Sequence, residues 1–173
     1  MLRAVLASLA LAGLVACLGP DPNLTDEGLA KPLLTVEFPT EAAPGATEDL
    51  RVEIENPGPG DMASFTVAFA NVAVAGSEGS VQPLLRPAPA PDRLADDQEV
   101  SPSIASIDPA PLTVGEGGLV FRFGPLPEEE DASLSFEVTV PEEPGTYAHS
   151  VQAFDSQVLD RIDAVKLQVE VGE

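Results

Sequence analysis

The feature that most constrains the fold of this chain is a regular alternation of apolar and polar residues. Between residues 50 and 55 each apolar residue is followed by a charged one, and residues 134–140 alternate in the same way. This period of two is typical of a β-strand with one face in a core and the other in water. Because related runs recur along the chain, the sequence predicts at least seven strands. The further runs are residues 34–38, 65–69, 119–123, 147–154 and 165–171.

Turn signals separate these runs. The stretch Asn56–Asp61, with the sequence NPGPGD, contains prolines that lack an amide donor and glycines that tolerate a positive φ. A second glycine-rich turn, Gly115–Gly118, precedes the run at 119–123. No segment has a sustained apolar period of 3.6 residues with helix caps. We therefore expect an all-β fold, an antiparallel β-sandwich that occupies residues 33–173.

The segment at about residues 76–102 does not fit this pattern. It contains five prolines, and residues 92–99 are rich in acidic side chains. A loop of this length inside a compact domain is usually functional or disordered. Its Pro-Ala-Pro-Ala-Pro stretch has polyproline character, which stiffens a chain. We expect a partly ordered surface loop here rather than a recognition motif.

The N-terminal residues have the features of a secretory leader. Met1–Arg3 carries one positive charge, and the thirteen residues Ala4–Ala16 contain no charged side chain. As a helix this run spans about 20 Å at 1.5 Å per residue, which is short of the ~30 Å hydrocarbon core of a bilayer. A cleaved signal peptide over residues 1–16 is therefore favoured over a transmembrane anchor.

The leader ends at the chain's single cysteine, Cys17, which follows Leu14, Val15 and Ala16. This LVAC sequence resembles the lipobox of bacterial lipoproteins. The resemblance implies cleavage before Cys17, a diacylglyceryl thioether on its sulfur, and a location outside the cytoplasm in the bacterial cell membrane or envelope. The alternative is that Cys17 is a small apolar residue of an ordinary secretory leader. Residues 17–32 mix Pro, Gly, Asp and Asn, which predicts a flexible tether.

Two stretches of the predicted sandwich resemble the immunoglobulin-like conserved-repeat domain of bacterial surface proteins, known as domain of unknown function eleven. In residues 48–59 a strand ends in Asn-Pro-Gly-Pro, and residues 123–147 combine a Gly-Pro-Leu turn, a long strand and the sequence Gly-Thr-Tyr. Adhesion-type and fibronectin-like modules share much of this pattern. The resemblance covers about residues 46–155 and implies an immunoglobulin-like sandwich for display, spacing or binding, without catalytic residues. The residues to which we give a structural role are Asn56, Gly58, Gly145 and Tyr147.

Two residues of the late strand at 147–154 have alternative interpretations. Tyr147 suggests a tyrosine corner, in which the ring packs near the start of the strand and the hydroxyl bonds to the backbone, but a simple cross-strand aromatic is equally compatible with the sequence. His149 stands near a position where the conserved repeats often have asparagine. As the only histidine, in mid-strand, it is expected to be a partly buried side chain with a backbone partner rather than a catalytic base.

Other signals of catalysis or metal binding are weak. One histidine and no second cysteine argue against a zinc site, and no hydrolase, zinc-protease or phosphate-loop motif is present. The acidic groups at residues 92–99 and 128–131 lack the spacing of a calcium loop and are interpreted as solvated turns. The sequence therefore predicts no enzyme, no cofactor and no metal.

The charge of the chain limits its partners. With 29 Asp and Glu against 8 Lys and Arg, the formal net charge is −21. This charge repels phosphate backbones and anionic lipid headgroups, so we expect no nucleic-acid partner. Contact with a membrane is expected through the lipid on Cys17, and the further partner is an unidentified protein or polysaccharide.

Two functional hypotheses follow. The first is a membrane-anchored, surface-exposed lipoprotein that acts as a non-catalytic structural or binding module. The second is an accessory lipoprotein that binds a small ligand or metal for an envelope enzyme or transporter. A hydrolase is a third and remote alternative. A concave cluster of polar residues would favour the second hypothesis, and a packed sandwich without a pocket would favour the first.

Overall fold

We describe the protein from a computed structural model, which covers residue 23 and residues 29–71, 81–88 and 99–172. The predicted leader, the lipobox with Cys17, most of the tether and the acidic residues 92–98 lie outside these described residues. No helix within the described ranges is long and apolar enough to span a membrane.

The described residues form eleven strands and one turn of 3₁₀-helix, η1. In chain order the elements are β1 (Leu33–Glu37), β2 (Glu41–Ala42), β3 (Thr47–Glu55), β4 (Phe65–Ala70), β5 (Gln82–Pro83), β6 (Ile104–Asp108), β7 (Thr113–Val114), η1 (Glu116–Gly118), β8 (Val120–Arg122), β9 (Asp131–Thr139), β10 (Gly145–Asp155) and β11 (Ile162–Val171).

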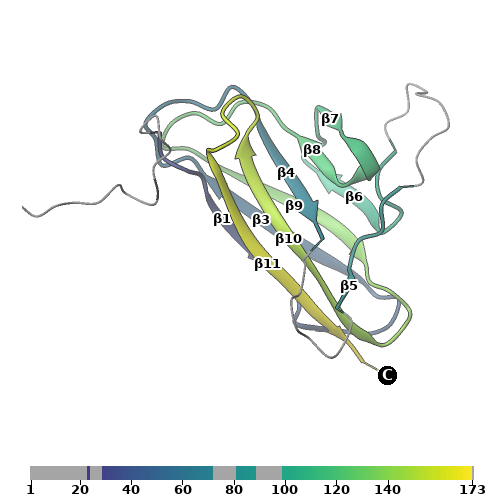
Figure 1. Cartoon of the computed structure of the whole chain (residues 1–173). Coiled ribbons are helices and arrows are strands. Elements are labelled where there is room, and N and C mark those ends of the chain that lie inside the picture. Colours follow the sequence, from purple (N-terminus) through teal and green to yellow (C-terminus); the bar gives the residue numbers. More distant parts are fainter. Residues whose placement is uncertain (1–22, 24–28, 72–80, 89–98, 173) are drawn as a thin grey trace, which may run out of the picture.

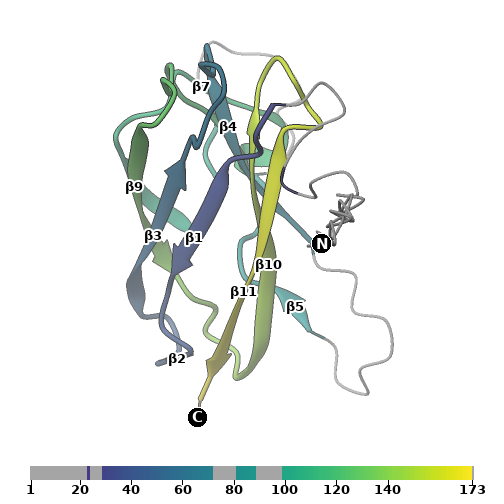
Figure 2. The same cartoon turned by 90° about the vertical axis from the view of Figure 1, so that its left-hand side faces the viewer.

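The strands make two sheets. One has four strands in the order β1-β3-β9-β6, all antiparallel. The other has seven strands, in the order β2-β11-β10-β4-β8-β7 with β5 also beside β10. Figures 1 and 2 show the two sheets lying face to face. The prediction of an all-β, layered fold is confirmed, but the larger sheet is mixed because β2 runs parallel to β11 and β5 parallel to β10.

The predicted alternation is present in the structure. In β3, Leu50, Val52 and Ile54 are fully buried while the residues between them are exposed. The core also joins aromatic rings of both sheets: Phe136 of β9 lies 5.3 Å from Phe69 of β4, ring centre to ring centre, and edge-to-face. The register predicted from the period of two therefore places these apolar side chains between the sheets.

The segment at 76–102 differs from the prediction in its described part. Residues 82–83 form β5, and the next two residues, Leu84 and Leu85, are fully buried. The expectation of a surface loop is therefore wrong here. The physical reason is that β4 pairs with β10 only as far as Ser150, whereas β5 pairs with β10 further along, at Tyr147 and Ala148. The two leucines that follow β5 then lie in the core.

The turn at η1 accepts hydrogen bonds from Ala88 and from Ser101. The amide of Ala88 donates to the carbonyl oxygen of Gly117 at 2.8 Å, and the amide of Ser101 donates to that of Gly118 at 3.0 Å. Gly118 has a φ of +65°, and a Cβ on it would lie 2.5 Å from the Ser101 nitrogen. Glycine is therefore required at this close approach.

Candidate functional site

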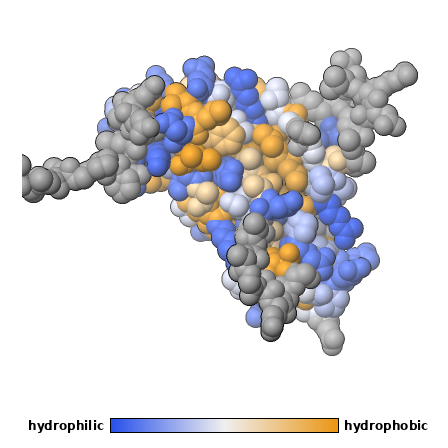
Figure 3. Space-filling view, viewed as in Figure 1, coloured by the Kyte–Doolittle hydropathy of each residue, from blue (hydrophilic) through white to orange (hydrophobic). Residues whose placement is uncertain are grey.

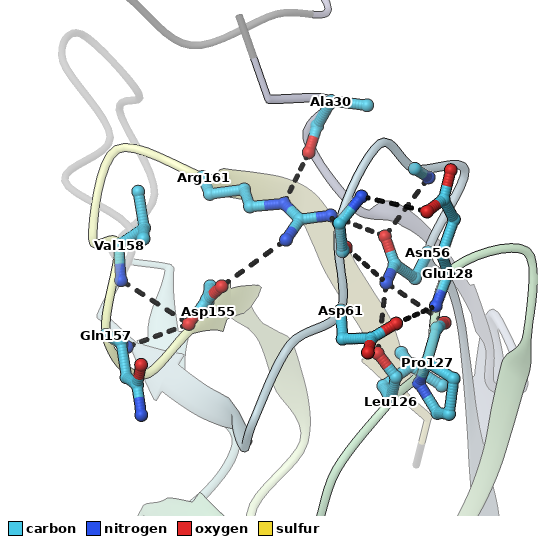
Figure 4. A network of polar contacts seen from close by, with 12 residues as sticks. Ala30, Asn56, Asp61, Leu126, Pro127, Glu128, Asp155, Gln157, Val158 and Arg161 are labelled. Atoms are coloured by element: carbon cyan, nitrogen blue, oxygen red, sulfur yellow. Dashed lines mark hydrogen bonds and ion pairs between the residues drawn. The ribbon is translucent and has the colours of Figure 1, made fainter. Parts of the chain in front are cut away.

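A buried arginine in the β10–β11 turn organises one end of the sandwich. The side chain of Arg161 is 1% exposed, yet its guanidinium bonds to three other segments (Figure 4). Nε donates to the carbonyl oxygen of Ala30 at 2.6 Å, and Nη2 donates to the carbonyl oxygen of Gly60 at 3.0 Å. Nη2 also donates to Oδ1 of Asn56. We call Arg161, Asn56, Asp155 and the Ala30 and Gly60 carbonyls the Arg161 cluster.

Asn56, at the end of β3, is the second centre of the Arg161 cluster and is fully buried. Its Nδ2 donates to the carbonyl oxygens of Gly60, Leu126 and Pro127 at 3.0–3.1 Å. Its Oδ1 accepts from the amide of Gly58 at 3.2 Å, where φ is +73°. The predicted structural residues Asn56 and Gly58 therefore lie together and tie the β3–β4 turn to the β8–β9 turn.

Asp155 neutralises the arginine. Its Oδ2 lies 3.4 Å from Nη1 of Arg161, and its carboxylate is also buried. The other oxygen, Oδ1, accepts from the amides of Gln157 at 2.8 Å and Val158 at 3.4 Å, which shapes the β10–β11 turn. Every buried side-chain nitrogen and oxygen within the described residues has a partner. The donors and acceptors of this cluster are thus used to hold the fold.

Sequence reasoning missed Arg161 and Asp155. Both lie in or beside the polar turn 156–161, where a charged side chain is normally solvated. Their burial depends on Asn56 and Ala30, which are about a hundred residues away in sequence. No local pattern in the sequence distinguishes them from the exposed Asp160 nearby.

Two exposed acidic residues, Glu128 and Asp61, lie beside the Arg161 cluster. Glu128 accepts from the amide of Gly60 at 3.2 Å, and its own amide donates to Asp61 at 2.9 Å. These carboxylates thus accept hydrogen bonds from backbone amides of the β3–β4 and β8–β9 turns. Across the described part of the chain no three His, Cys, Asp or Glu side chains come together in a way that could hold a metal.

Tyr147 and Gly145 lie at the opposite end of β10 from Arg161. The Tyr147 side chain is buried and its hydroxyl donates to the carbonyl oxygen of Glu143, four residues upstream, at 2.8 Å. Gly145 has a φ of +157°, and a Cβ there would meet the tyrosine ring at 3.7 Å. The ring and hydroxyl therefore close the β9–β10 turn in the manner of a tyrosine corner.

His149 is fully buried, and both ring nitrogens bond to backbone. Nε2 accepts from the amide of Leu85 at 2.9 Å, so Nδ1 carries the proton and donates to the carbonyl oxygen of Ala70 at 3.0 Å. Burial lowers the pKa of His149 below its ordinary value of 6.5, against the hydrogen bonds to Ala70 and Leu85, which raise it. The ring is a neutral link between the end of β4 and the residues after β5.

The described surface has hollows, and they are lined mainly by polar residues. One hollow lies over β1 and β3, and its lining includes Glu37, Glu48, Asp49 and Glu137 with one cation, Arg51. Four of these side chains are exposed and Glu48 is half-buried. The hollow is therefore an acidic surface depression.

No protein-family model and no curated protein sequence matches this chain. Among solved structures, it is similar to AvmM, which catalyses macrocyclization in alchivemycin A biosynthesis, with 15% identity, a TM-score of 0.42, and coverage of 81% of this chain and 89% of that one. It is also similar to a β-glucosidase from Listeria innocua, with 16% identity and a TM-score of 0.36. That match covers 83% of this chain and 16% of the glucosidase.

Proposed function

We propose that this protein is a bacterial lipoprotein, anchored by lipid on Cys17, whose β-sandwich is a non-catalytic structural or binding module at the cell surface. The observation that carries the proposal is the LVAC sequence that ends the uncharged run of the leader at Cys17. The Arg161 cluster adds the place of the anchor relative to the domain. It fixes the chain at Ala30, only 13 residues after Cys17, at one end of the sandwich. An anchor at Cys17 would therefore hold a defined end of the domain near the membrane.

The length of the tether supports this arrangement. Thirteen residues reach at most about 45 Å when fully extended. Strand β11 begins next to Arg161 and runs away from it, so the β9–β10 turn and Gly172 lie at the far end (Figure 2). The domain would then present that far end to the surroundings. Two or three acyl chains give stable anchoring, since each buried methylene contributes about 0.8 kcal/mol.

The sandwich is proposed to be immunoglobulin-like. The order β1-β3-β9-β6 corresponds to strands A-B-E-D of an immunoglobulin domain, and β11-β10-β4 corresponds to G-F-C. Tyr147 near the start of β10 then stands where immunoglobulin domains have their tyrosine corner. One departure is that β7 and β8, which extend the second sheet beyond β4, follow β6 in sequence.

The state of His149 supports a non-catalytic role. A histidine base needs a ring nitrogen within reach of a nucleophile or substrate. Here Nδ1 and Nε2 are occupied by the backbone of Ala70 and Leu85, and the side chain has no exposed surface. Such a histidine stabilises the fold.

The test is metabolic labelling with palmitate in a bacterial host. We expect the full chain to incorporate label, and Cys17→Ser to remain an unlabelled, uncleaved precursor. Ser8→Ala, a conservative change within the leader, serves as a matched control and is expected to be labelled. Label that persists in Cys17→Ser would overturn the lipoprotein proposal.

A further inference from the structure

The chain just before β1 makes a contact that bears on the tether to Cys17. The amide of Lys31 donates a hydrogen bond to the carbonyl oxygen of Asn23 at 2.8 Å, although the two residues are eight positions apart in the chain. Asn23 is therefore held against the segment that leads into β1. We call Asn23 together with residues 29–31 the N-terminal clasp.

The N-terminal clasp is fixed to the Arg161 end of the sandwich. Ala30 is 8% exposed, and its carbonyl oxygen accepts the 2.6 Å hydrogen bond from Nε of Arg161. The side chain of Leu29 lies beside Gly60, since its Cδ2 would be 3.8 Å from a Cβ on that glycine. Gly60 is itself bonded to Arg161 through its carbonyl oxygen. The clasp thus continues the Arg161 cluster as far as Asn23.

The N-terminal clasp changes how far the sandwich can stand from an anchor at Cys17. Counted to Ala30 the tether is 13 residues long, but counted to Asn23 it is only six. Six residues reach at most about 20 Å when fully extended, compared with about 45 Å for thirteen. While the clasp is closed, the residues between Asn23 and Ala30 do not add to this reach.

We propose that the N-terminal clasp halves the reach of the tether and makes the sandwich a membrane-proximal module. The proposal rests on the lipid anchor proposed above. Strand β10, with 11 residues, runs the length of the sandwich and spans about 36 Å at about 3.3 Å per residue. The β9–β10 turn at the far end then lies within about 60 Å of the membrane surface. The binding partner is therefore expected in the same membrane or in the layer next to it.

The surface at the Arg161 end does not itself favour contact with lipid. Figure 3 shows hydrophilic and apolar side chains interspersed at the upper end of the molecule, where Figure 1 shows the β10–β11 turn. Three turns at this end carry exposed carboxylates, namely Asp61, Glu128 and Asp160. Negative charges of this kind repel anionic headgroups. The distance between this end and the membrane is therefore set by the tether.

The test measures the height of the Arg161 end above the membrane. The full chain is placed in vesicles of phosphatidylethanolamine and phosphatidylglycerol that also contain a lipid with Ni²⁺ chelated at its headgroup. This ion quenches a fluorophore only at short range. Because acylation would use the only native thiol, Ala63→Cys, at an exposed position of the β3–β4 turn, carries the fluorophore. The closed clasp predicts that this fluorophore is quenched.

Lys31→Pro opens the N-terminal clasp, because proline has no amide hydrogen to donate to Asn23. Lys31→Ala keeps this amide and is the matched control. Release lengthens the tether from six residues to thirteen, which raises the root-mean-square length of a flexible chain about 1.5-fold. We therefore expect quenching to fall about two-fold in Lys31→Pro and to stay unchanged in Lys31→Ala. Equal quenching in the two variants would overturn the proposal.

Hydrogen exchange tests the N-terminal clasp without any substitution. In the unsubstituted full chain the amide of Lys31 is bonded to Asn23, so it should exchange at least about ten-fold more slowly than in an unfolded peptide of the same sequence. Exchange at the unfolded rate would overturn the clasp whether or not Lys31→Pro folds. Failure of the anchor is seen separately, as a maleimide-reactive Cys17, and does not alter the exchange at Lys31.

Discussion

Arg161 donates a 2.6 Å hydrogen bond to the backbone of Ala30, although the two residues are 131 positions apart in the chain. This bond joins the last β-turn of the domain to the segment through which the protein would reach its lipid. The rest of the guanidinium is bound to Asn56, Gly60 and Asp155. The arginine thus links the segment at Ala30 to the β3–β4 turn and to the β10–β11 turn.

Arg161→Ala is expected to destabilise the fold by about 3–5 kcal/mol, because it leaves the carboxylate of Asp155 buried without its partner. Chemical denaturation measures this loss. Arg51→Ala, at an exposed position, is the control and should change the free energy of unfolding by less than about 0.5 kcal/mol. A loss below about 1 kcal/mol for Arg161→Ala would mean that the cluster does not hold this end together.

Gly118→Ala is expected to cost at least about 2 kcal/mol. The new methyl group would meet backbone atoms of residues 99–101 at 2.5–2.7 Å, at a φ of +65° that alanine tolerates poorly. Gly124→Ala is the matched change, since a Cβ at Gly124 has no neighbour within 4 Å. Thermal denaturation should show a lower melting temperature for Gly118→Ala only, and equal melting temperatures would refute the close approach.

The register of β9 predicts opposite outcomes for two adjacent residues. Phe136→Asp should cost several kcal/mol, because it removes a fully buried ring and places an unpaired charge in the core. Glu137→Lys, at an exposed position, should change stability by less than about 0.5 kcal/mol. If denaturant unfolding showed a larger loss of stability for Glu137→Lys than for Phe136→Asp, the register of β9 would be wrong.

His149 makes stability depend on pH. Because burial lowers its pKa in the folded state, the unfolded chain takes up a proton near pH 6.5 before the folded chain does. The free energy of unfolding should therefore fall as the pH drops from 7.5 to 5.5, by at most about 1.4 kcal/mol per pH unit from this residue. His149→Gln removes the titration, so the difference between the two profiles isolates it. Parallel profiles would contradict a neutral, buried His149.

The strands of the sandwich could be predicted from sequence because the period of two is local. Leu50 to Glu55 and Leu134 to Val140 each contain enough residues to show which face is buried. Turn residues such as Gly58 were also recognisable, since a positive φ favours glycine wherever it occurs.

Features that depend on distant partners could not be predicted in this way. Leu84 and Leu85 follow a strand of two residues, too short to show a period, and their burial is decided by where β4 stops pairing with β10. Arg161 is buried because the folded chain brings hydrogen-bond acceptors to its guanidinium. These acceptors belong to Asn56, Gly60, Asp155 and Ala30. His149 was expected to have a backbone partner, but its two partners were not identifiable from sequence.

The central claim, a lipid anchor on Cys17, is tested most directly by mass spectrometry of the N-terminal peptide from protein extracted from bacterial membranes. The account predicts a peptide that begins at Cys17 and carries the mass of a diacylglyceryl thioether on its sulfur. A peptide that begins at any other residue, or a Cys17 with a free thiol, would contradict it.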